Sequence, residues 1–189
     1  MFIQTETTPN PATLKFLPGQ VVMDMGTADF RDPGEAAAKS PLAARLFDVD
    51  GVKGVFFGYD FVTVTKDDDL EWPHMKPAVL AAIMEHFMAG APVMAEQHDG
   101  AAPAADEEFF DAGDESIVAT IKELIETRVR PAVAQDGGDI TFQGYRDGVV
   151  FLHMKGACAG CPSSTATLKH GIQNLLRHFI PEVEQVEAV

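Results

Sequence analysis

Cysteine is scarce in this chain, which holds only Cys158 and Cys161 among 189 residues. So few cysteines exclude a disulfide framework, because secreted domains that depend on disulfides carry several bridges. The sequence has no apolar run long enough to cross a bilayer, so we expect no membrane partner. The N-terminal stretch MFIQTETTPNP has neither a basic region nor an apolar run, and we therefore expect no secretory signal.

Positive charge is also scarce, with 14 Lys and Arg residues against 29 Asp and Glu residues and a net charge of −15. Such a surface repels phosphate groups, which excludes nucleic acid as an expected partner. The N-terminus, which begins at Met1, lacks the arginine-rich amphipathic pattern of a transit peptide. We therefore expect a protein of the reducing bacterial cytoplasm, and of the mitochondrial matrix only if the chain is a mature organellar form.

An acidic stretch over residues 90–113 divides the chain. It is rich in Ala, Pro, Gly and acids, contains no Lys or Arg, and shows no sustained hydrophobic period. This composition predicts a flexible acidic linker, in which only Phe109 and Phe110 are candidates for docking on a neighbouring domain. The expected domains are therefore residues 1–89 and residues 114–189.

The N-terminal domain alternates short β-prone runs with helical patterns. Ser40 and Pro41 have the residue types of a helix N-cap and first helical position, and predict a helix over residues 40–47. A second predicted helix covers residues 72–89 and ends at Gly90. The β-prone runs predict strands over residues 2–7, 13–17, 20–25, 52–58 and 61–66.

The C-terminal domain has the same αββα core order. Ile117, Ile121, Leu124 and Ile125 recur with a helical period, and Pro131 is expected to kink or end that helix before the turn QDGGD. A hairpin with the turn RDG follows, then a helix and a short last strand. The predicted ranges are 140–145 and 148–155 for the hairpin strands, 163–179 for the helix and 184–189 for the last strand. We therefore predict an α+β protein of two small α/β-layered domains joined by the linker.

The loop GACAGCPSS, residues 156–164, holds both cysteines and allows three interpretations. The first is a pair of buried apolar residues, but the small neighbours of the pair offer little apolar area for packing. The second is a thiol–disulfide oxidoreductase, since a helix N-terminus lowers a thiol pKa. Against it, no aromatic residue precedes Cys158, and a helix precedes the strands, which is the wrong order for a thioredoxin-like βαβ unit.

The third interpretation is a metal site, because two thiolates separated by two residues can bind an iron–sulfur cluster or zinc from one turn. Gly156 and Gly160 would shape the loop so that a bulky cluster can approach the backbone. Donors of Ser163, Ser164 and Thr165 at the start of the following helix would stabilise an anionic thiolate or sulfide.

The number of ligands then decides how such a site is completed. An iron–sulfur cluster or closed zinc site normally takes four protein ligands, and this chain supplies two thiolates. His153 is expected on the strand face away from the core, and His170 lies nine residues beyond Cys161, about 13 Å along a helix. Two copies of the chain related by a two-fold axis would instead supply four thiolates around one metal centre.

The C-terminal domain resembles a known family. Residues 128–183, through the turn QDGGD, the hairpin and the loop GACAGCPSS, resemble the NifU-like C-terminal domain of Nfu-type iron–sulfur scaffold proteins. The stretches FIQTETTPNPATLKF, GVFFGYDFVTVTK and AVLAAIMEHF resemble the N-terminal domain that accompanies it in bacterial and mitochondrial members. Together these regions cover nearly the whole chain outside the linker.

The resemblance implies a non-enzymatic scaffold or carrier that receives a [4Fe–4S] cluster from assembly machinery and delivers it to apo-proteins. It implies a homodimer in which Cys158 and Cys161 of each subunit bridge one shared cluster. Whether [2Fe–2S] forms are also held stays open, as do a dimer-bridging zinc site and the oxidoreductase. The N-terminal domain contains no cysteine, and we hypothesise that it recognises client proteins or tunes dimerisation.

Overall fold

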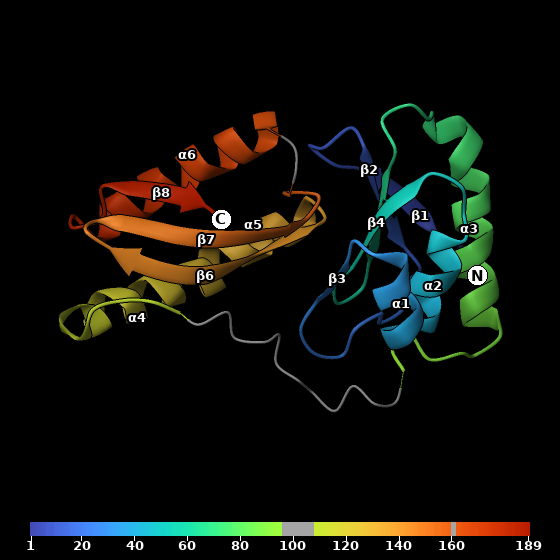
Figure 1. Cartoon of the computed structure of the whole chain (residues 1–189), viewed down its shortest axis with the longest axis horizontal. Coiled ribbons are helices and arrows are strands. Elements are labelled where there is room, and N and C mark those ends of the chain that lie inside the picture. Colours follow the sequence, from blue (N-terminus) through green and yellow to red (C-terminus); the bar gives the residue numbers. More distant parts are fainter. Residues whose placement is uncertain (96–107, 160–161) are drawn as a thin grey trace. The chain divides into compact units, whose positions relative to one another are not determined.

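A computed structural model describes residues 1–95, 108–159 and 162–189, apart from the side chains of residues 162–164 (Figure 1). The chain divides into two compact units, Met1–Ala102 and Pro103–Val189, and is α+β throughout. Within the described ranges, the helices are too short or too polar to cross a membrane.

The N-terminal unit is built on a five-stranded antiparallel sheet of order β1-β2-β5-β4-β3. Its strands are β1 (Gln4–Thr7), β2 (Thr13–Leu17), β3 (Ala28–Phe30), β4 (Val52–Phe57) and β5 (Val62–Lys66). Four of the five predicted strands are confirmed. The strand predicted over residues 20–25 is wrong: Val22 and Met23 donate to the Tyr59 carbonyl instead, at 2.7 and 3.2 Å. Positive φ angles at Gly19 (77°) and Gly26 (70°) turn the chain on both sides of this stretch.

Helices cover one face of this sheet (Figure 1). They are α1 (Pro33–Lys39), α2 (Pro41–Phe47) and α3 (Trp72–Met88). The Ser40 side chain caps α2 by accepting from the Ala43 amide at 3.0 Å, as predicted. Helix α1 was not predicted, although Asp32 caps it through the Glu35 amide and Pro33 opens it. The faces of sheet and helices enclose a core that includes Phe16, Leu42, Leu46, Phe57, Val62, Val79 and Ile83.

The chain beyond α3 turns back along this unit. Gly90 ends the helix with a φ of 65°, as predicted. The Ser40 hydroxyl then donates to the Val93 carbonyl at 2.5 Å, and the Ala95 amide donates to the Lys39 carbonyl at 2.9 Å. The buried His86 ring contacts the Pro92 carbonyl through Nε2 at 3.1 Å. The first described part of the predicted linker is therefore docked on the N-terminal unit.

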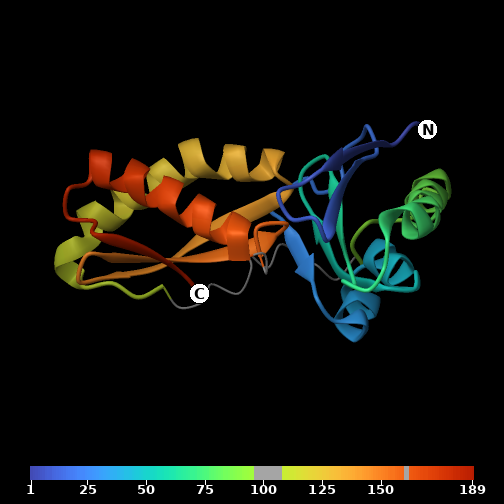
Figure 2. The ribbon, with the colours of Figure 1, turned by 90° about the horizontal axis from the view of Figure 1, so that it is seen from above.

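The C-terminal unit packs its helices on one side of a three-stranded sheet of order β6-β7-β8 (Figure 2). Strands β6 (Gly138–Arg146) and β7 (Val149–Gly156) form the predicted hairpin, and β8 (Gln185–Ala188) runs parallel to β7. At the hairpin turn, Asp147 and Gly148 have φ angles of 49° and 77°, as a two-residue turn requires. The helices are α4 (Glu115–Leu124), preceded by the short η1 (Ala112–Asp114), then α5 (Arg130–Gln135) and α6 (Pro162–Phe179).

Pro131 distorts the first helix as predicted. Between α4 and α5 lies η2 (Ile125–Val129), a π-helical turn, in which the Arg130 amide donates to the Ile125 carbonyl. Proline has no amide to give the Thr127 carbonyl, so the hydrogen-bond pattern widens just before it. The helix then ends at Gln135, before the turn QDGGD, where Gly137 has a φ of 80°.

Phe109 extends the sheet of the C-terminal unit beyond β6. Its amide donates to the Gln143 carbonyl at 3.3 Å, and its carbonyl accepts from the Tyr145 amide at 2.8 Å. Its ring packs on Phe151 with centroids 5.1 Å apart and covers Gly144, where a Cβ would meet the ring at 2.5 Å. Both described ends of the predicted linker are thus docked, while residues 96–107 lie outside the description.

Side-chain alternation along β7 follows the prediction. Val150, Leu152 and Met154 are buried, whereas His153 is half-buried on the other face. In α6, Ile172 and Leu176 are buried in the core, whereas Phe179 is 48% exposed.

Candidate functional site

The cysteine loop connects the end of β7 to the start of α6. Gly156 turns the chain with a φ of 66°, as its expected role in shaping the loop requires. The Ala157 amide then donates to the Gly137 carbonyl at 3.2 Å, and the Ala159 amide donates to the Gly156 carbonyl at 3.1 Å. The first bond ties the loop to the turn that precedes β6, and the second closes a turn within the loop.

Cys158 is buried, which the sequence did not predict. Its side chain is 7% exposed and belongs to the core of the C-terminal unit. The small neighbours of the cysteine offer little apolar area themselves, but the core of strands and helices behind the loop supplies it. A Cβ placed on Gly138 would lie 2.7 Å from Cys158 Sγ, so the glycine makes room for the sulfur.

Burial changes the chemistry of the Cys158 thiol. It raises the pKa of Cys158 to about 12, and the negative charges of Asp136 and Asp139 act in the same direction. The metal-free chain therefore holds this thiol in its protonated form at neutral pH. A dithiol oxidoreductase needs a thiol pKa lowered toward neutrality, and the pKa of Cys158 is shifted in the opposite direction.

The structure describes only some of the other predicted site residues. Cys161 and Gly160 lie outside the described residues. Ser163 and Ser164 belong to the first turn of α6, but their side chains lie outside the description. The Thr165 hydroxyl donates to the Cys158 carbonyl at 3.0 Å, so Thr165 fixes the loop backbone from the helix start.

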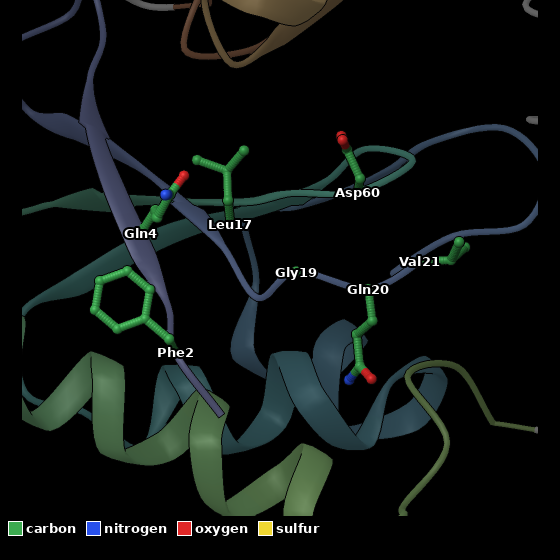
Figure 3. A pocket seen from close by; sticks show the side chains of 7 residues that line it. All are labelled: Phe2, Gln4, Leu17, Gly19, Gln20, Val21 and Asp60. Atoms are coloured by element: carbon green, nitrogen blue, oxygen red, sulfur yellow. The ribbon is translucent and has the colours of Figure 1, made fainter.

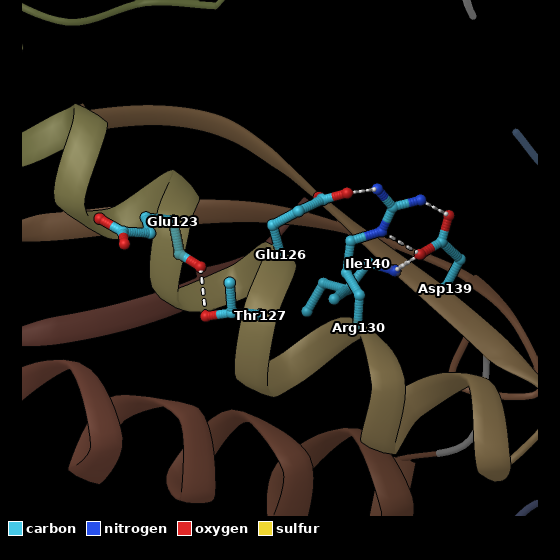
Figure 4. Close-up of polar contacts among 6 residues, drawn as sticks. All are labelled: Glu123, Glu126, Thr127, Arg130, Asp139 and Ile140. Atoms are coloured by element: carbon cyan, nitrogen blue, oxygen red, sulfur yellow. Dashed lines mark hydrogen bonds and ion pairs between the residues drawn. The ribbon is translucent and has the colours of Figure 1, made fainter.

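An ion-pair cluster lies next to the loop, at the start of β6 (Figure 4). Arg130 donates through Nε and Nη2 to both carboxylate oxygens of Asp139, at 2.9 and 3.0 Å, and through Nη1 to Glu126 at 2.8 Å. Asp139 is 4% exposed and also accepts from the Ile140 amide at 2.8 Å. The hydrogen bond from Arg130 to Asp139 is the main cause that raises the pKa of the guanidinium.

Sequence reasoning missed this cluster. Its position matters because Asp139 pairs with Lys155 and Gly138 pairs with Gly156 across the ladder from β6 to β7. Arg130 therefore holds the strand end that supports the cysteine loop. The spacing of Glu126 and Arg130, four residues apart on a helix, was the available signal.

The histidines of the C-terminal unit lie on β7 and α6, outside the cysteine loop. His153 is half-buried on the sheet face away from the core, and His170 and His178 are exposed. Across the described ranges, three or more His, Cys, Asp or Glu side chains do not gather into a group that could hold a metal ion.

Two family models match the chain, one for each unit. The Nfu/NifU scaffold-protein N-terminal domain matches residues 3–90, and the NifU-like domain matches residues 121–187. A solved structure, the NMR structure of a NifU-like protein from Saccharomyces cerevisiae, covers 51% of this chain and 87% of its own, with 27% identity and a TM-score of 0.46.

Full-length similarity is found to curated relatives. The Drosophila erecta protein named "NFU1 iron-sulfur cluster scaffold homolog, mitochondrial" is 56% identical over 100% of this chain and 65% of its own length. The Homo sapiens protein of the same name is 50% identical over 100% of this chain and 72% of its own. The chain thus spans about two thirds of the relatives that it matches. Their names fit the organellar alternative of our expected compartment and give no support to the bacterial cytoplasm.

Proposed function

The chain belongs to the family of Nfu-type, NifU-like iron–sulfur cluster scaffold proteins, and on this premise we propose that it carries a cluster and delivers it to apo-proteins. The observation that carries the proposal is the conjunction of the family match with the site. The pair Cys158 and Cys161 lies inside the matched NifU-like domain, on a loop held by Gly156, Gly138 and Thr165. In this role the protein is a carrier rather than an enzyme, and the cluster is its cargo.

We propose Cys158 and Cys161 as the protein ligands of the cargo. Thiolates are the ligands that iron–sulfur clusters prefer, and two of them separated by two residues can reach one centre. The Cys158 thiol is buried beside Gly138, and like any cysteine ligand it must lose its proton to bind iron.

We further propose that the cargo is a [4Fe–4S] cluster shared between two copies of the chain. Such a cluster takes four thiolates, and each copy supplies two. The partners in this proposal are a second copy, a cluster-donating assembly protein and apo-protein clients. A [2Fe–2S] cluster held by the same four thiolates, and a zinc ion that links two copies, are the competing outcomes.

Anaerobic reconstitution of the full chain with iron and sulfide tests this function. We expect about two irons and two sulfides per chain, together with a shift from monomer to dimer in sedimentation analysis. The variants Cys158→Ala and Cys161→Ala should each lose the cluster, while circular dichroism shows that they remain folded. A full cluster in either variant would contradict the ligand assignment, and zinc at half an equivalent per chain would contradict the cargo.

A further inference from the structure

Acids that lack a cation partner are expected on a chain of net charge −15, and their surroundings decide whether they matter. Asp60 is the one charged residue among the described residues that line a cavity of about 490 Å³ on the N-terminal unit (Figure 3). Asp136 has different surroundings, because it lies in the turn before β6, to which the cysteine loop is bonded. Its charge therefore lies close to the proposed cluster site.

The turn before β6 packs against the cysteine loop. Its Gly137 carbonyl accepts from the Ala157 amide at 3.2 Å. A Cβ on the next residue, Gly138, would lie 2.7 Å from Cys158 Sγ. Asp136 immediately precedes these two glycines. Besides burial, which is the main cause, the negative charge of Asp136 raises the pKa of Cys158. A carboxylate therefore acts on the Cys158 sulfur from the side of this turn.

Asp139 is the second carboxylate that acts on Cys158, and it differs from Asp136 in its partners. Asp139 is buried, and Arg130 donates to both of its oxygens at 2.9 and 3.0 Å. The same guanidinium also donates to Glu126 at 2.8 Å, so one cation serves two carboxylates. Asp136 is exposed and forms no ion pair with any residue that the structure describes. Of the two carboxylates near Cys158, Asp136 is therefore the one without an ion pair.

The position of Asp136 at a helix end also opposes stability. Asp136 is the C-cap of α5, and its amide donates to the Ala132 carbonyl at 3.4 Å. The carbonyl groups at a helix C-terminus carry partial negative charge, so a carboxylate there is unfavourable. An uncharged side chain would avoid this repulsion. A local choice that opposes stability is typical of functional sites.

We propose that Asp136 loosens the hold of the chain on its cargo by electrostatic repulsion, which favours delivery of the cargo. A metal centre bound by four thiolates carries net negative charge, because each thiolate ligand adds a negative charge to it. This role rests on the proposed carrier function, with Cys158 as a ligand. Asp136 acts through its charge and not as a ligand itself. When two copies share one cluster, each copy brings its own Asp136, so the repulsion acts from both.

The test compares the full wild-type chain with Asp136→Asn after anaerobic reconstitution with iron and sulfide. Release of iron to bipyridine, an uncharged chelator, is followed by absorbance, so that the probe adds no charge of its own. We expect Asp136→Asn to bind as much iron as the wild-type chain and to release it about threefold to tenfold more slowly. Removal of a negative charge also favours an added electron. The reduction potential should therefore rise, by up to about 59 mV, which is a tenfold change for one electron.

Matched variants separate a role of charge from a structural role. Asp136→Glu keeps the charge and should release iron at the wild-type rate. Asp147→Asn removes the same charge at the far end of β6, where asparagine tolerates the φ of 49°, and should change neither release nor potential. The effect of Asp136→Asn should shrink as salt is added, because salt screens an exposed charge. Urea unfolding should show that Asp136→Asn is at least as stable as the wild-type chain.

The proposal is overturned if Asp136→Asn releases iron as fast as the wild-type chain or faster, or if Asp147→Asn slows release equally. It is also overturned if Asp136→Asn binds less iron, since Asp136 would then be a ligand or a support of the loop. A wild-type chain that loads no cluster refutes the carrier function, and this role of Asp136 with it. Normal loading of both chains with equal release refutes the role of Asp136 alone.

Discussion

Cys158 and Gly138 pack against each other so closely that a single added methyl group on the glycine would come within 2.7 Å of the sulfur. The same methyl group would meet the Lys155 carbonyl at 2.8 Å and the Cys158 amide at 3.2 Å. Two of these three neighbours are backbone atoms, which cannot swing away as a flexible side chain does. The Cys158 sulfur therefore occupies the space that a side chain at Gly138, the first residue of β6, would need.

We expect Gly138→Ala to displace the cysteine loop. Overpacking of this kind costs about 1–3 kcal/mol, and the displaced thiol should reduce the iron bound after reconstitution. Urea unfolding and iron analysis measure the two effects. Gly171→Ala is the matched control, because Gly171 lies exposed in α6 with open space around its Cα, and alanine should stabilise that helix by about 1 kcal/mol. Equal iron binding by both variants would show that the packing around Cys158 does not matter.

The pairing of Arg130 with Asp139 should be sensitive to loss of either partner. Arg130→Met removes the guanidinium from the buried carboxylate of Asp139, and we expect a loss of about 3–5 kcal/mol in the free energy of unfolding. Arg130→Lys keeps the charge but loses the bidentate contact with Asp139. Its loss in the free energy of unfolding should therefore be smaller than that of Arg130→Met. Arg45→Met, which breaks an exposed pair with Glu85, should cost about 1 kcal/mol or less. Similar losses for Arg130→Met and Arg45→Met would contradict the importance of burial.

His86 should make the N-terminal unit sensitive to acid. Burial lowers the pKa of His86 below its ordinary value of 6.5, and the charge of Arg45 lowers it further. The unfolded chain therefore takes up a proton that the folded chain resists. The contribution of His86 to stability is fully present above about pH 6.5 and is lost as the pH falls through the folded-state pKa, by up to about 1.4 kcal/mol per pH unit.

Trp72 provides the measurement, because it is the single tryptophan of the chain and packs 6.4 Å from Phe16 in the N-terminal unit. Its fluorescence in urea titrations should show a lower free energy of unfolding at pH 5.5 than at pH 7.5. His86→Gln preserves a donor toward the Pro92 carbonyl without a titrating ring, and should flatten the pH dependence. The exposed His74 offers the control, His74→Gln. If His74→Gln flattens the pH dependence and His86→Gln does not, the assignment to His86 is wrong.

Removal of the Phe109 ring should release the chain that precedes α4. Phe109→Ala loses the contacts with Phe151 and Gly144, together with the Arg146 guanidinium that lies 5.3 Å from the ring centroid. We expect a loss of about 1–3 kcal/mol in the stability of the C-terminal unit. The Tyr145 amide, which donates to the Phe109 carbonyl, should exchange with deuterium faster in NMR spectra. Phe110→Ala, at a side chain 38% exposed, is the control and should leave this amide protected.

Local patterns in the sequence were enough to predict most of the fold. The hairpin of β6 and β7, the Ser40 cap and the distortion of the helix before Pro131 each depend on residues that are close in sequence. The strand predicted over residues 20–25 failed because its backbone bonds to Tyr59, which is distant in sequence. Helix α1 was missed although Asp32 and Pro33 carried its start signal, because its seven residues show little hydrophobic period.

The assignment of the site to Cys158 and Cys161 stays a prediction, and the sequence did not predict the environment of Cys158. The sequence shows that Cys158 has small neighbours, and from these alone an exposed loop is the natural inference. Its burial depends on Gly138 and on the core behind it, which come together only through the register of β6 against β7. The same register places Asp139 beside the loop. No pattern of neighbouring residues predicts that Asp139 pairs with Arg130.

The contacts of Ala95 and Phe109 also limit how far apart these two residues can lie. Both residues are bonded to their own unit, so the covalent tether that separates the two units has at most fourteen peptide steps, from 95 to 109. A chain of that length cannot reach beyond about 50 Å even when fully extended. This limit applies to the separation of Ala95 and Phe109, and release of the Phe109 anchor would raise it without any change in sequence.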